Sequence, residues 1–245
     1  MLAINNTGND QHAPGKDAAQ TAFFQLSRQL AHDFNNIWAR IFGLTQQAKE
    51  MPGFQDRDEV LDKIGAASSS GLLYSRNIMQ ILMDSGADSK VFDACEVIRE
   101  WAYESGEMLQ DGIDISCLIP PYALHVDFKQ NTLRLILLSL IGYVLRSGET
   151  KRWTMIGVRS VSDDKRAGTE AADSVDIMFL CRLTDYRGSD SGPQFQKRVD
   201  AITALVGPYA GTTNTWVVPN VGVNLRIRLP LMAAPEAPPI ASRIV

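Results

Sequence analysis

Residues 30–36 of this chain read Leu30-Ala31-His32-Asp33-Phe34-Asn35-Asn36, and this stretch decides the fold of the N-terminal part. Apolar residues recur around it in steps of four and three, a heptad pattern that predicts an amphipathic helix with a seam for a partner helix. His32 lies off this seam, so the pattern predicts an imidazole that faces water. The seam consists of Leu30, Phe34, Ile37, Ile41, Leu44 and Ala48.

A second helix with the same spacing is predicted over about 57–83, after a first helix over about 21–50. Met51-Pro52-Gly53 separates them, because proline removes a backbone donor and glycine tolerates the turn. The two helices are expected to form an antiparallel hairpin. One hairpin cannot cover both of its apolar stripes, so the simplest closed arrangement is a four-helix bundle formed by a homodimer.

From residue 91 onward the pattern changes to alternating helices and strands. Asp93 is the expected N-cap of a helix over about 94–109, and a long buried helix is expected over about 130–146. Another helix is expected over about 194–209, and strands are expected at 113–118, 123–126, 154–161, 175–183, 215–218 and 223–229. The predicted fold class is α+β: a hairpin domain over 20–84, an α/β sandwich over 91–232, and disordered tails at 1–19 and 233–245.

Composition excludes several kinds of partner. A net charge of −4 argues against a nucleic-acid backbone, whose partners are basic. The apolar run at 133–145 is too short to cross a bilayer, so we expect no membrane partner and a cytoplasmic location. Cys95, Cys117 and Cys181 show no metal-ligand spacing and are expected to be reduced core residues.

The run from Ala31 to Ile37 resembles the H-box of bacterial two-component histidine kinases. The resemblance implies that His32 is phosphorylated at Nε2, that Asp33 holds or deprotonates the ring, and that Asn36 lies one turn away on the same side. Imidazole can attack a phosphoryl group near neutral pH, and a neighbouring carboxylate favours the tautomer that frees the attacking nitrogen. The alternative is an ordinary solvated pair on a helix surface.

The region from 91 to 232 resembles the ATP-binding domain that follows this hairpin in histidine kinases, but the nucleotide-binding elements are missing. Tyr143 stands where that family has a magnesium-binding asparagine. The segment at 185–189 lacks the glycines of the adenine loop, and only Gly188 and Gly192 fall in the place of the lid. Together these losses remove most of the positioning and charge stabilisation that transfer from ATP requires.

The resemblance therefore implies a dimeric histidine phosphotransferase that passes a phosphoryl group between receiver-domain aspartates through His32. The receiver supplies Mg²⁺, so no cofactor is expected in this chain. The expected partners are response-regulator receiver domains, including that of a hybrid kinase, and Arg28, Asn35 and Arg40 are the expected docking residues. Three alternatives stay open: a non-catalytic pseudokinase scaffold, a phosphatase that uses Asp33 and Asn36 to position water, and an ATP-dependent histidine kinase.

Overall fold

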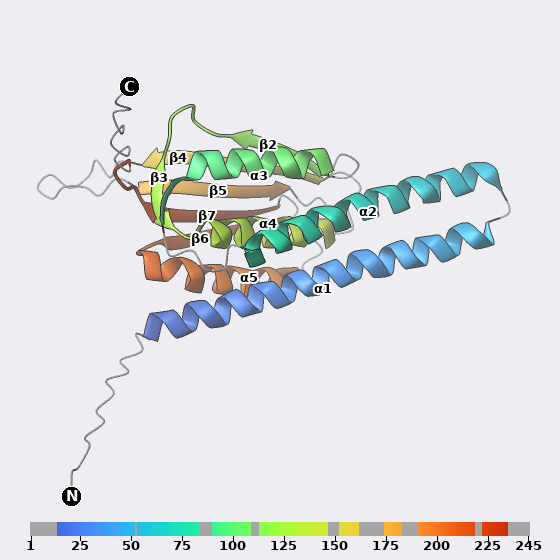
Figure 1. Cartoon of the computed structure of the whole chain (residues 1–245), viewed down its shortest axis with the longest axis horizontal. Helices are drawn as coiled ribbons and strands as arrows, with labels where there is room; N and C mark the ends of the chain where they lie inside the picture. The colour runs from blue at the N-terminus through green and yellow to red at the C-terminus, as the bar shows by residue number, and fades with distance from the viewer. Residues whose placement is uncertain are drawn as a thin grey trace, which may run out of the picture.

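The computed structural model describes residues 14–51, 53–83, 90–108, 113–146, 152–161, 174–182, 191–218 and 222–234. Within these ranges the chain forms a long helical hairpin that lies along a mixed helix and sheet domain (Figure 1). The mixed fold class predicted from the sequence is confirmed. The dimeric four-helix bundle requires a second copy of the chain and stays a prediction.

The hairpin consists of α1 (Pro14–Glu50) and α2 (Phe54–Met83), which lie side by side and run antiparallel (Figure 1). Helix α1 begins before the predicted residue 21, because proline is tolerated in the first turn, where its missing N–H would have no helical partner. Residues 14–19 therefore belong to the helix and not to the predicted tail, whose residues 1–13 lie outside the described ranges. No helix in the described ranges is both long and apolar enough to span a membrane.

The second domain is built on a five-stranded sheet with the strand order β2-β4-β5-β7-β6. Strands β2 and β4 are parallel, and the other neighbours are antiparallel. A short antiparallel pair, β1 and β3, forms a second sheet. The strands are β1 (Lys90–Asp93), β2 (Ile113–Leu118), β3 (His125–Phe128), β4 (Arg152–Val161), β5 (Ser174–Arg182), β6 (Thr212–Val218) and β7 (Gly222–Pro230). The sequence pattern did not predict β1, because four residues carry too little alternation to indicate a strand.

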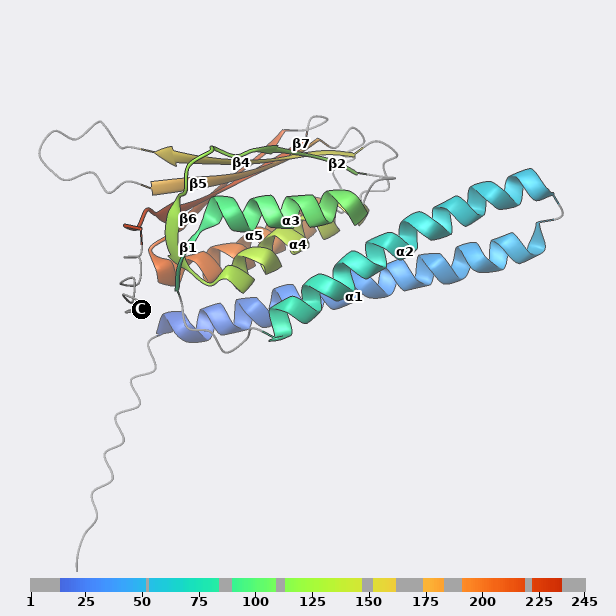
Figure 2. The same cartoon turned by 45° about the horizontal axis from the view of Figure 1, so that its top comes forward.

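Three helices lie between the five-stranded sheet and the hairpin (Figure 2). They are α3 (Ala94–Met108), α4 (Gln130–Arg146) and α5 (Ser191–Val206), and a 3₁₀ turn, η1 (Gly207–Tyr209), follows α5. Asp93 caps α3 as predicted, since its Oδ1 accepts hydrogen bonds from the backbone N–H groups of Cys95 and Leu124, both at 2.9 Å.

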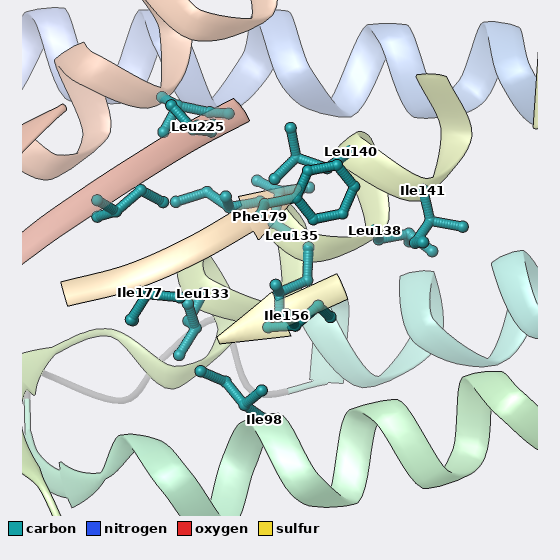
Figure 3. Close-up of a cluster of buried hydrophobic side chains, with 14 of the residues drawn as sticks. Ile98, Leu133, Leu135, Leu138, Leu140, Ile141, Ile156, Ile177, Phe179 and Leu225 are labelled. Atoms are coloured by element: carbon teal, nitrogen blue, oxygen red, sulfur yellow. The ribbon is translucent and has the colours of Figure 1, made fainter. Parts of the chain in front are cut away.

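Helix α4 is the centre of the core, and every residue from 132 to 144 is buried. Figure 3 shows its leucines and isoleucines beside Ile156, Ile177, Phe179 and Leu225 of the sheet. The hairpin packs against α4 from the other side. Each buried large aliphatic side chain of this kind stabilises the fold by about 1.5–3 kcal/mol.

The hairpin is therefore covered in part by its own chain. Ala22, Leu26 and Leu30 on α1 are at most 3% exposed and belong to the same core cluster as α4 and α5. The sequence interpretation left the seam to the helices of a dimeric bundle, and this is wrong for its first residue, Leu30, which is buried in the core of its own chain. The reason is that apolar spacing shows which face of a helix is buried but not which segment buries it.

The face of the sheet opposite the helices carries a charge cluster. Buried Asp176 of β5 accepts hydrogen bonds from Arg159 of β4 at 3.2 Å and from Nε of Arg228 of β7 at 2.7 Å. Burial alone would raise the pKa of Asp176, but the hydrogen bonds from Arg228 and Arg159 outweigh it and lower the pKa below its usual value. The ionised carboxylate therefore ties three neighbouring strands together.

The cysteines divide into two groups. Cys95 and Cys181 are buried as predicted, and burial raises the pKa of Cys95 to about 11, so its thiol stays protonated. Cys117 is exposed, which contradicts its prediction as a core residue. It lies on β2, an edge strand of the sheet.

Candidate functional site

His32 lies on α1 with 65% of its side chain exposed, as the heptad pattern predicts. Asn36 lies one turn further along the helix, and its Nδ2 is 3.1 Å from His32 Nδ1. The amide nitrogen can only donate, so Nδ1 accepts in this arrangement and the ring proton is on Nε2. The structure thus brings Asn36 into direct contact with the imidazole, on the side of the helix that the sequence predicts.

Asp33 does not face water beside His32. Its side chain is 2% exposed, and its Oδ1 is 3.8 Å from His32 Nδ1, which is beyond hydrogen-bond distance. Successive residues of an α-helix point about 100° apart, so the neighbour of an exposed histidine can face a different environment. The hydrogen bond to the ring comes from Asn36 and not from Asp33.

Asp33 is instead paired with Arg198 of α5. The Nη2 group of Arg198 donates to Asp33 Oδ2 at 2.9 Å, and Nη1 donates to the backbone oxygen of Ser139 in α4. The two ionic side chains are only 1% and 2% exposed. This buried ion pair connects the helix that carries His32 to two helices of the sandwich domain.

A glycine makes room for this ion pair. A Cβ atom added to Gly142 of α4 would lie 2.6 Å from Asp33 Oδ2 and 1.9 Å from the hydroxyl oxygen of Tyr74, a buried residue of α2. Both distances are too short for a side chain to fit without movement. Helices α1, α2, α4 and α5 therefore meet around the Asp33 carboxylate.

Sequence reasoning missed Arg198, although the sequence contains a signal for it. Arg198 shares the apolar face of α5 with Phe195, Val199 and Ile202, since these positions are three or four residues apart. A lone arginine on a buried face must find an anionic or carbonyl partner. The sequence could indicate this need, but it could not identify Asp33 as the partner.

The predicted docking residues surround His32. Arg28, Asn35 and Arg40 are all exposed on α1, between one turn before and about two turns after the histidine. Positions three and four residues apart share a helix face, so Arg28 and Asn35 flank the imidazole directly. Their accessibility is what docking requires, and docking itself stays a prediction.

The residues that stand where histidine kinases bind nucleotide are either part of a helix of the sandwich domain or outside the described ranges. Tyr143 is buried and packs against Phe195 with a ring centroid distance of 5.1 Å, so its phenol belongs to the core. The segment at 185–189 lies outside the described residues, and Gly192 falls within α5. In the part of the chain that the structure describes, no group of three or more His, Cys, Asp or Glu residues could hold a metal ion.

No protein-family model and no curated protein matches this chain. Among solved structures, the chain is similar to the ATP binding domain of PrrB from Mycobacterium tuberculosis, with 20% identity over 60% of this chain and 100% of that one, and a TM-score of 0.42. A bacterial phosphotransferase shows 9% identity over 85% of this chain and 96% of that one, with a TM-score of 0.48. A histidine kinase from Burkholderia phymatum shows 11% identity over 85% of this chain and 99% of that one, with a TM-score of 0.44. These similarities concern the fold and assign no activity to this chain.

Proposed function

We propose that this chain is a histidine phosphotransferase that carries a phosphoryl group on His32 from one receiver-domain aspartate to another. The observation that carries the proposal is an exposed imidazole whose Nδ1 is held by Asn36, on a helix anchored to a folded domain. Of the predicted docking residues, Arg40 then contacts the receiver beside the imidazole, whereas Arg28 and Asn35 share the helix face of Phe24 and Phe42 and face the second copy in the homodimer proposed below. The nucleophile and its immediate neighbours are the part of the chemistry that this chain supplies.

In the uptake step, Nε2 of neutral His32 attacks the phosphorus of an aspartyl phosphate. The Nε2–P bond forms as the O–P bond breaks, and its electron pair goes to the aspartate carboxylate. During this step the ring proton must be on Nδ1, where Asn36 can accept it with Oδ1 after a half-turn of its amide. The Nδ1 proton then leaves to water, which reaches the exposed ring. The receiver's Mg²⁺ offsets the charge of the phosphoryl oxygens.

The phosphoryl group comes from a receiver and not from ATP bound to this chain. Burial of Tyr143 supports this, because a metal ligand in that position would have to face a nucleotide. The burial of α4 from residue 132 to residue 144, between the sheet and the hairpin, supports it further. No cofactor of this chain is therefore part of the proposal.

The proposed functional unit is a homodimer. Phe24, Trp38 and Phe42 on α1 are 62%, 55% and 67% exposed, and their spacing of 14 and 4 residues places them on one face. Large apolar side chains also stand exposed on α2, at Leu61, Leu72 and Met79. Exposed apolar residues at helical spacing on both arms of a hairpin indicate a helical partner. A second copy would cover both stripes and complete the four-helix bundle.

A comparison of two phosphoryl donors tests the proposed function. The purified chain is incubated with a labelled phosphorylated receiver domain and, separately, with labelled ATP and Mg²⁺. We expect acid-labile label from the receiver and none above background from ATP. Label from ATP would contradict the proposal in favour of a kinase. Absence of label from a panel of phosphorylated receivers would contradict it in favour of a binding scaffold.

The Trp38→Glu/Phe42→Glu variant tests the dimer, because it places two charges on the exposed stripe of α1. We expect the variant to sediment as a monomer at concentrations at which the unchanged chain is a dimer, a shift in the dissociation constant of at least about 100-fold. Analytical ultracentrifugation gives the masses. Tyr122→Glu, at a 54% exposed residue outside the hairpin, is the matched control and should stay dimeric. A monomeric unchanged chain would contradict the prediction.

A further inference from the structure

We propose that Arg198 is a positioning residue for the phosphorylated form of His32. It holds the Asp33 carboxylate away from the imidazole, so that the phosphohistidine survives between two receivers. This inference rests on the proposed function, since it concerns the lifetime of the intermediate in the transfer. It assigns Asp33 a role different from the direct ring contact that the sequence suggests.

The geometry places Asp33 close to the ring but directs it elsewhere. Its Oδ1 is 3.8 Å from His32 Nδ1, so a small side-chain rotation would bring the two into hydrogen-bond distance. The 2.9 Å bond from Arg198 to Oδ2 opposes that rotation. Arg198 is itself held by its second bond, to the backbone oxygen of Ser139. Asn36 then makes the shorter contact with Nδ1 of the ring, at 3.1 Å against 3.8 Å for Asp33.

The identity of the group beside Nδ1 matters for the stability of the intermediate. In hydrolysis, a water oxygen attacks the phosphorus, the Nε2–P bond breaks, and its electron pair goes to Nε2, which yields imidazole and inorganic phosphate. Protonation at Nδ1 makes the ring a better leaving group. A carboxylate beside Nδ1 favours the protonated ring, whereas an amide N–H that donates to Nδ1 opposes protonation. An Asp33 carboxylate directed at Nδ1 therefore shortens the lifetime of the phosphohistidine, and an Asn36 N–H that donates to Nδ1 prolongs it.

Arg198 determines whether the Asp33 carboxylate or the Asn36 amide contacts Nδ1 of the ring. A buried carboxylate without a cation is strongly unfavourable and seeks a positive partner. Without Arg198, the protonated ring of His32 is a cationic partner within reach of Asp33. Loss of Arg198 therefore turns Asp33 toward His32, although Arg198 itself lies on another helix and is buried.

Chemical loading of His32 with phosphoramidate tests this role without any receiver. We expect Arg198→Met to shorten the half-life of phospho-His32 at neutral pH by roughly 3–10-fold, because an Asp33 carboxylate that has lost its ion pair with Arg198 favours protonation at Nδ1. Imidazole ¹⁵N spectra of the unphosphorylated protein should show His32 Nδ1 changing from a hydrogen-bond acceptor to a protonated donor. The double variant Asp33→Asn/Arg198→Met removes the carboxylate charge and should restore both the half-life and the spectrum. Arg198→Lys keeps the charge and should recover most of the half-life.

Arg134→Met is the matched control, since Arg134 is also buried where the hairpin meets the sandwich domain but pairs with Glu100 and Gln80. Its half-life and His32 spectrum should match the unchanged chain. Equal shortening in Arg198→Met and in the double variant would overturn the proposal, because the effect would then not run through Asp33. An unchanged His32 spectrum in Arg198→Met would overturn it as well. Failure of receivers to phosphorylate His32 would count against the proposed function alone, because these measurements use chemically loaded or unphosphorylated protein.

Discussion

Replacing His32 with alanine is expected to abolish acid-labile phosphorylation by a phosphorylated receiver, a loss of more than about a thousandfold in the rate of uptake. Alanine has no nucleophilic nitrogen, and no neighbouring side chain can replace one. The exposed position of His32 means that the fold should not change, so the free energy of unfolding should stay within about 0.5 kcal/mol. The measurement is a quenched time course of labelled phosphate transfer, together with a thermal melt.

His125→Ala is the control for this experiment. His125 lies on β3, is half-buried, and has its backbone paired in the short sheet. Its replacement should leave transfer unchanged, because it lies outside the helix that carries His32. If His32→Ala still took up acid-labile label, another residue would be the acceptor and the proposed site would be wrong. If His32→Ala instead lost transfer but still changed the activity of a partner kinase, the chain would act as a binding scaffold in addition to transferring phosphate.

Breaking the Asp33–Arg198 ion pair from one side is expected to give the largest loss of stability among single substitutions near the site. Arg198→Ala leaves the buried carboxylate without its cation, which costs about 3–5 kcal/mol. For a chain of this length, that loss lowers the melting temperature by roughly 6–20 °C. Chemical denaturation with urea gives the free energy of unfolding, and a thermal melt gives the temperature shift.

The double variant Asp33→Leu/Arg198→Met removes both charges and refills the space with apolar groups. It should recover most of the lost stability, since a buried ion pair can be replaced by apolar residues of similar volume with little net cost. Arg159→Met, at an arginine whose side chain is 54% exposed, is the control and should change stability by no more than about 1 kcal/mol. A loss below about 1 kcal/mol in Arg198→Ala would show that the ion pair does not hold the hairpin on the domain.

Local patterns predicted much of this structure. The heptad spacing around residues 30–48 predicts the hairpin helix and the exposure of His32, and both are confirmed. Asp93 is confirmed as the N-cap of α3. These features depend on contacts between residues a few positions apart, so the periodicity of side chains along a helix or strand is enough to reveal them.

The surroundings of Asp33 could not be predicted in this way. Asp33 was expected to hold the ring of His32. Its Oδ1 lies 3.8 Å from Nδ1, but its Oδ2 accepts a hydrogen bond from Arg198, 165 residues later in the chain. Two other features could not be predicted for the same reason, since they also join residues far apart in the chain. They are the pairing of β1 with β3 and the burial of Leu30 against the sandwich domain.

The sequence by itself determined which helix carries His32 and that its imidazole faces water. Only the tertiary structure decided that the carboxylate of Asp33 is buried and paired with Arg198. The physical reason is that periodicity specifies the direction of a side chain relative to its own helix, whereas its partner depends on how distant helices pack.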